Sequence, residues 1–139
     1  MITSQLIREL KSDEGFMPHE YKDSLGYSTI GYGRLIDKRK GGGITEDEAD
    51  YLLSNDVAKS WDAVKKAIPW IIDQPETVQR ALANMSFQMG IQGLLGFKNS
   101  LEFIKSGQYD KAQSNLRASK WYTQTPKRAE RVIQMVKRP

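Results

Sequence analysis

The stretch SDEGFMPHEYKDSLGYSTIGYGR, residues 12–34, decides how the chain is organised. The residues before it carry apolar side chains at helical spacing, but this spacing is lost in its second half, where three glycines appear. Tyr, Ser, Thr and Ile interleaved with Gly predict short antiparallel strands joined by tight turns. We therefore expect a helix over residues 3–13, ended by Gly15, and strands near residues 27–30 and 34–36.

Two of the three carboxylates in this stretch have settings that suit a catalytic pair. Glu14 falls at the negative end of the expected helix dipole, which opposes ionisation and favours an acid that keeps a proton to donate. Asp23 opens a turn, where water keeps it charged. Such a pair suits glycoside hydrolysis, but spacing alone also allows a plain helix end and an ordinary turn aspartate. Glu20 has no special context, and Thr29 fits a strand from which its hydroxyl can hold a water.

The remainder of the chain predicts helices. Thr45 and Glu48 form a capping box, in which each side chain satisfies a free backbone N–H group of the other residue. Apolar residues then recur every 3.6 residues until Pro69, so we expect a long helix over residues 46–68 that joins two lobes. Further helices are predicted after Pro75 as far as Gly90, over residues 97–106 and 109–118, and after Pro126.

The expected architecture is α+β and mostly α-helical, in a single domain over residues 1–139. A small N-terminal lobe, about 13–50, holds the short antiparallel sheet. The long helix links it to a helical C-terminal lobe, about 70–139, on which the helix at 3–13 packs.

Composition argues against several classes of site. The chain has no cysteine and a single histidine, His19, so we expect no metal site, no disulfide and no Ser-His-Asp triad. Nothing implies an organic cofactor. No apolar run approaches the roughly 20 residues that a membrane span needs, and the first ten residues lack the pattern of a signal peptide. We expect no membrane insertion and accumulation in the compartment of synthesis.

Positive charge is concentrated near the C-terminus. Residues 104–139 contain nine Lys or Arg and two acids, Asp110 and Glu130, whereas the rest contains 12 basic and 15 acidic residues. A basic segment of this kind suggests a polyanionic partner such as nucleic acid, an anionic membrane or an anionic cell-wall polymer. A solvated face kept for solubility explains it equally well.

Several motifs make the chain resemble the T4-type phage lysozymes, the endolysins of glycoside hydrolase family 24. They occur in the order of the family and cover nearly the whole chain. The motifs are DEG (13–15), YKD (21–23), GYSTIGYGR (26–34), GITEDEA (43–49), FQMG (87–90), GFKNSL (96–101), SKWY (119–122) and QTPKRAERVI (124–133). The Glu-to-Asp spacing followed by TxGxG is specific, and the later motifs argue strongly against chance.

The resemblance implies a lysozyme-like fold with an active-site cleft between the lobes. It implies a muramidase that cleaves the β-1,4 bond between N-acetylmuramic acid and N-acetylglucosamine in peptidoglycan. Glu14 would be the proton donor, Asp23 the second carboxylate, and Thr29 a hydroxyl that places the attacking water, which favours inversion. Arg128 would lie near Glu14 and favour its ionised form. The substrate contacts carried over are Leu35, Phe87, Ser100 and Asn115.

Three functions remain open at this stage. The first is an active, monomeric muramidase with peptidoglycan as its partner, which a separate membrane-permeabilising protein releases from the host cytoplasm for cell lysis. The second is an inactive wall-binding relative, against which the intact site residues argue. The third is a nucleic-acid-binding module, suggested by the C-terminal charge and by Trp121 and Tyr122. It leaves the N-terminal motifs unexplained, so we expect no nucleic-acid partner.

Overall fold

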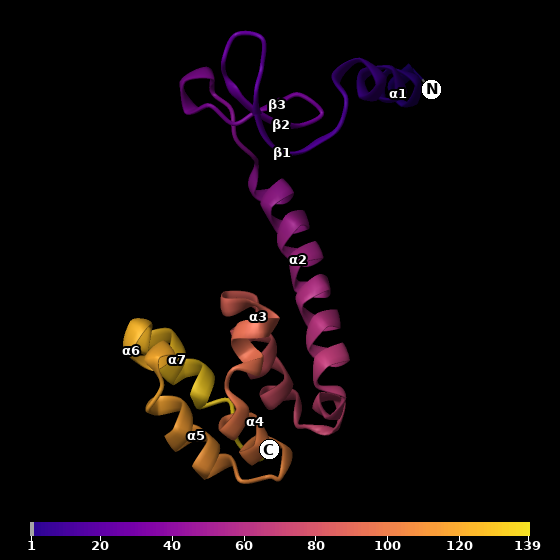
Figure 1. Cartoon of the computed structure of the whole chain (residues 1–139). Helices are drawn as coiled ribbons and strands as arrows, with labels where there is room; N and C mark the ends of the chain where they lie inside the picture. Colours follow the sequence, from indigo (N-terminus) through magenta and orange to yellow (C-terminus); the bar gives the residue numbers. More distant parts are fainter. Residues whose placement is uncertain (1) are drawn as a thin grey trace. The chain divides into compact units, whose positions relative to one another are not determined.

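The protein is described by a computed structural model over residues 2–139, with side chains from residue 4 onward. It forms two compact units, one up to Tyr51 and one from Leu52. The boundary between them falls inside helix α2 (Glu46–Ala67). The bounds of this helix agree to within one residue with the predicted long helix over residues 46–68. Figure 1 shows the elements along the chain.

The first unit begins with helix α1 (Ile2–Glu14), which extends one residue beyond the predicted 3–13 at each end. Gly15 ends it with a positive φ of 70°, and its N–H donates to the carbonyl of Lys11 at 3.0 Å. Three apolar side chains of this helix remain about half exposed. They are Leu6, Ile7 and Leu10.

A three-stranded antiparallel sheet follows, in the order β1 (Met17–Lys22), β2 (Ser28–Gly31) and β3 (Arg34–Leu35) (Figure 1). The last two strands agree with the prediction to within one residue. Strand β1 was not predicted, because its sequence MPHEYK contains a proline and no alternation of apolar and polar residues. The sheet tolerates this proline because β1 lies at its edge.

The start of α2 carries the predicted capping box, which is confirmed. The Thr45 N–H donates to Glu48 Oε1 at 2.9 Å, and the Glu48 N–H donates to Thr45 Oγ1 at 3.2 Å. A short 3-10 turn, η1 (Lys38–Lys40), precedes this helix, and another, η2 (Pro69–Asp73), follows it.

Arg34 ties strand β3 to the same capping box. Its guanidinium donates to both carboxylate oxygens of Glu48, at 2.8 and 2.7 Å, and to the carbonyl of Gly43 at 3.1 Å. The hydrogen bonds from Arg34, and next those from the Thr45 backbone, lower the pKa of Glu48 to about 2. The Glu48 carboxylate therefore caps α2 and, through Arg34, also binds β3.

The second unit is helical. Its remaining helices are α3 (Glu76–Leu95), α4 (Lys98–Lys105), α5 (Tyr109–Arg117), α6 (Lys120–Gln124) and α7 (Pro126–Ile133). Gly90 breaks α3 as predicted, with φ 79° and ψ 164°, but helical residues resume after it as far as Leu95. The short helix α6 was not predicted.

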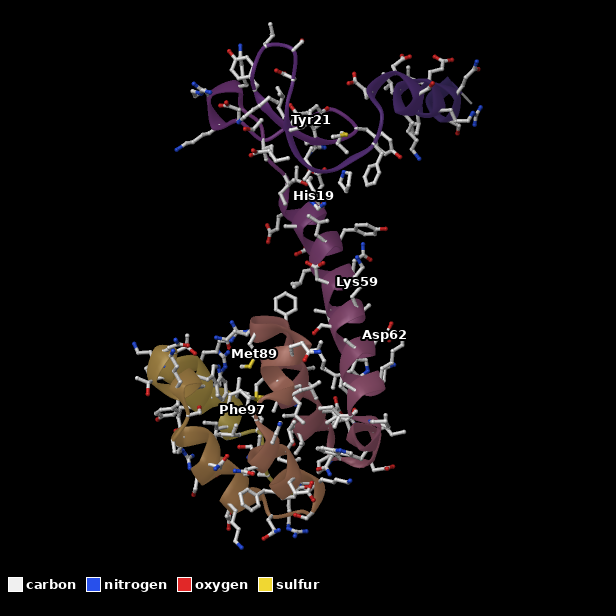
Figure 2. The ribbon with its side chains drawn as sticks, in the orientation of Figure 1. His19, Tyr21, Lys59, Asp62, Met89 and Phe97 are labelled. Carbon is white, nitrogen blue, oxygen red and sulfur yellow. The ribbon has the colours of Figure 1, made fainter. Side chains whose placement is uncertain are left out.

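The buried hydrophobic residues that the structure describes all belong to the second unit, from Val64 to Val136. Met89 and Phe97, labelled in Figure 2, pack against this core. The molecule therefore has the expected α+β, mostly α-helical composition, with a small sheet in one unit and a helical core in the other. Within residues 2–139, no helix is both long and apolar enough to cross a membrane.

Two adjacent isoleucines test the position of the core. Ile71 is 0 % exposed and Ile72 is 63 % exposed. We expect Ile71→Ala to lower the free energy of unfolding by about 2–5 kcal/mol, because it leaves a cavity. Ile72→Ala should change it by less than about 0.5 kcal/mol. Urea denaturation measures both, and equal effects would contradict the described packing.

The pair between Arg34 and Glu48 predicts a pH effect. The pKa of Glu48 is about 2 when folded, below its ordinary 4.5, so the pair contributes stability above pH 4.5. That contribution is lost as the pH falls from 4.5 to about 2. Arg34→Met should raise the pKa of Glu48 part of the way back, because the Thr45 N–H still binds it. Arg39→Met, which removes the partner of Asp37 instead, should leave Glu48 unchanged in an NMR titration.

Candidate active site

Glu14 is the last residue of α1, and the β2–β3 hairpin packs against it. A Cβ atom built on Gly33 would lie only 2.8 Å from Glu14 Oε2, so the carboxylate rests against a bare Cα atom. Tyr32, at the tip of the hairpin, contacts two residues that lie near Glu14 in the sequence. The centroid of its ring lies 5.5 Å from the ring centroid of Phe16 and 5.4 Å from the ammonium nitrogen of Lys11.

Asp23 occupies the predicted turn after β1, which is confirmed. Its Oδ1 accepts from the N–H of Leu25 at 2.9 Å and from the N–H of Tyr27 at 2.8 Å. The Asp23 carbonyl also accepts from the N–H of Gly26 at 2.9 Å. The side chain therefore organises the turn, which is the usual behaviour of an aspartate at this place. These bonds restrict the orientation of the carboxylate.

Thr29 lies in β2, opposite Tyr21 of β1 and Leu35 of β3. It is 2 % exposed, and its hydroxyl donates to the carbonyl of Tyr27 at 2.9 Å. The N–H of the same Tyr27 binds Asp23. One residue of the turn therefore connects the second carboxylate with the threonine hydroxyl.

The second unit has an apolar groove of about 280 Å³. Leu53, Val57 and Phe87 contribute apolar side chains to its lining, and Phe87 is 45 % exposed. Arg128 of α7 also lines it, and its guanidinium donates to Asn84 Oδ1 at 3.2 and 2.9 Å. No motif or spacing in the sequence singles out Asn84, because only the folded chain brings α3 and α7 together.

Ser100 and Asn115 form a pair between α4 and α5. The Ser100 hydroxyl donates to Asn115 Oδ1 at 2.6 Å. Ser100 is 1 % exposed, whereas Asn115 is exposed. The structure therefore presents Asn115 at the surface and places Ser100 behind it, where its hydroxyl fixes the amide.

The expected site residues fall into two groups. Glu14, Asp23, Thr29 and Leu35 belong to the first unit, and Phe87, Ser100, Asn115 and Arg128 belong to the second. Within the first, Thr29 and Leu35 belong to the β2–β3 hairpin and Asp23 to the turn before it, while Glu14 ends α1 and lies beside Gly33 of the hairpin. Among the described side chains, no group of three or more His, Cys, Asp or Glu residues could hold a metal ion.

Comparison with known proteins agrees with the resemblance seen in the motifs. The family model for phage lysozyme matches residues 11–138. The chain is 30 % identical to probable T4-type lysozyme 1 of Dictyostelium discoideum, over 91 % of this chain and 90 % of that protein. It is 32 % identical to probable T4-type lysozyme 2 of the same organism, over 95 % and 93 %. It is also 32 % identical to peptidoglycan hydrolase gp36 of Pseudomonas phage phiKMV, over 91 % of this chain and 14 % of that protein. The chain belongs to the phage lysozyme family.

Proposed function

We propose that the protein is a glycoside hydrolase of the muramidase type. It hydrolyses the β-1,4 bond between N-acetylmuramic acid and N-acetylglucosamine in peptidoglycan. The observation that carries this proposal is the pair of motif carboxylates in different settings. Glu14 rests against Gly33 at the end of a helix, and Asp23 is bound by two backbone N–H groups in a turn. Membership of the phage lysozyme family supports the same class of reaction.

In the proposed mechanism, Glu14 gives its proton to the glycosidic oxygen as the bond from that oxygen to the anomeric carbon breaks. A water molecule attacks the anomeric carbon, and its proton passes to Asp23. The products together contain the atoms of the substrate and one water. Glu14 is then left ionised and Asp23 protonated, so a proton exchange with solvent restores the starting state.

Thr29 fits the role of a residue that orients the water. Its hydroxyl proton is already donated to the Tyr27 carbonyl, so its oxygen is free only to accept. A water that donates a hydrogen bond to this oxygen has its lone pairs directed away from Thr29. Those lone pairs are then available to attack the anomeric carbon. Attack by water on the face opposite the leaving group inverts the anomeric carbon, so NMR of the wild-type reaction should detect the α anomer first.

The second unit is proposed to bind the sugar chain. Exposed Asn115, fixed by Ser100, offers an amide to polar groups of the substrate, and Phe87 offers apolar surface to the sugar rings. Leu35, in the first unit, is proposed as a further apolar contact of the substrate.

The charge distribution supports an anionic wall as the partner. Residues 104–139 contain nine basic residues and two acids. One of these acids, Glu130, is already paired with Arg117 at 2.9 Å. The remaining excess of cations suits capture of a polyanion. The protein is proposed to act as a monomer that reaches the wall from the host cytoplasm after a separate protein permeabilises the membrane.

The alternative is an inactive, wall-binding relative with the same fold. Only a measurement of turnover distinguishes such a relative from an enzyme.

The structure argues against a nucleic-acid-binding function, because Trp121 is not placed to contact a base. Trp121 is 7 % exposed, its Nε1–H donates to Gln88 Oε1 at 3.0 Å, and its ring meets Phe97 edge-on. Its ring is therefore not available to stack on a base.

Clearing of a peptidoglycan suspension tests the carboxylates. Glu14→Gln should lower the rate by about 10²–10⁴-fold with unchanged thermal stability, because the amide has no acidic proton to donate. Asp23→Asn should also lose most activity. Glu20→Gln is the matched control, since Glu20 is an exposed glutamate of the same unit, and it should stay within about twofold of wild type.

A folded Glu14→Gln protein with wild-type clearing would overturn the assignment of Glu14. An inactive wild type that still sediments with the wall would instead support the wall-binding relative.

Asn115 is tested by Asn115→Ala, with Ser114→Ala, an exposed neighbour on α5, as the control. Losing one hydrogen bond to the substrate should raise KM for soluble glycan fragments roughly 2- to 12-fold. The control should not change KM. Equal KM values for the two variants would remove Asn115 from the proposed substrate contacts.

A further inference from the structure

Gly33 has two structural features that coincide at the proposed acid. Its φ is +77°, a left-handed conformation that an L-residue adopts only at a cost. A Cβ atom at this place would also lie 2.8 Å from Oε2, 3.1 Å from Cδ and 3.5 Å from Cγ of Glu14. The whole end of the glutamate side chain therefore lies over the position that any other residue would fill.

The hairpin that carries Gly33 is fixed from both directions. Before it in sequence, Tyr32 contacts Phe16 and Lys11, which lie close to Glu14 in the chain on either side. After it, Arg34 is bound to Glu48 and to the carbonyl of Gly43. Because the tip cannot move away easily, a new side chain at Gly33 would displace the flexible carboxyl group instead of the backbone.

We propose that Gly33 is a positioning residue for the general acid. Its missing side chain leaves the space in which the Glu14 carboxyl group lies, and the hairpin backbone limits where that group can point. This inference rests on the proposed role of Glu14 as proton donor. Gly33 itself takes no part in bond making, and acts only through the position of Glu14.

Gly31 in the same hairpin provides a matched control. Its φ is +70°, close to that of Gly33, but a Cβ atom built on it meets no atom within 4 Å. Alanine at either position therefore has a similarly unfavourable φ, and only Gly33→Ala places a methyl group against the acid. The melting temperature should fall by a similar amount in both variants, roughly 2–8 °C.

The kinetic readout is kcat and KM on soluble peptidoglycan fragments. Gly33→Ala should lower kcat about 10- to 100-fold, since a displacement of about 1 Å has effects of that size, with KM within twofold. Gly31→Ala should keep kcat within about threefold of wild type. Equal losses of kcat in the two variants would overturn the proposal.

A second readout does not depend on turnover. With ¹³C-labelled glutamate, the carboxyl resonance of Glu14, assigned from its absence in Glu14→Gln, should shift in Gly33→Ala and not in Gly31→Ala. An unshifted resonance in Gly33→Ala would overturn the proposal even if the wild type proves inactive on peptidoglycan. If Gly33→Ala does not fold, Gly33→Asn and Gly31→Asn replace the pair, because asparagine tolerates positive φ while keeping the Cβ atom.

Discussion

The first unit depends on how the β2–β3 hairpin closes. The strands pair Ile30 with Arg34, so only three residues make the turn, and two of them are glycines with positive φ. This closure brings the hairpin tip over the end of α1 and aligns Leu35 with Thr29. It also delivers Arg34 to the first turn of α2. Because none of the side chains that the structure describes in this unit is a buried hydrophobic one, such directional contacts decide its geometry.

The second unit is stabilised differently. Its helices surround a core in which large aliphatic side chains are fully buried, and polar pairs lie at the edge of that core. Burial of this kind limits side-chain motion, which favours a constant orientation of the groups attached to it. The bond between Ser100 and Asn115 illustrates this, since a hydroxyl that water does not reach fixes an amide that water does reach.

Local signals in the sequence predicted the local features well. The capping box at Thr45 and Glu48, the helix end at Gly15 and the turn at Asp23 each depend on residues a few positions apart. Strand β1 was not predicted, because its own composition does not favour a strand. Its pairing with β2 makes it one. Ser100 stays a predicted substrate contact, and its burial could not be predicted because it depends on the packing of α4, which periodicity does not resolve. The contact of Gly33 with Glu14 joins positions 19 residues apart, and the sequence showed only a glycine in a turn.

The concentration of cations in residues 104–139 has a consequence for how such a protein can change. These residues lie in the second unit, whereas the two proposed catalytic carboxylates lie in the first. Under the proposed function, attraction to the wall and cleavage of its glycan are therefore encoded in different stretches of the chain. Substitutions in residues 104–139 can strengthen or weaken adhesion to the wall without changing the catalytic carboxylates. The reverse also holds, so a lineage can lose the reaction and still inherit a protein that adheres to walls.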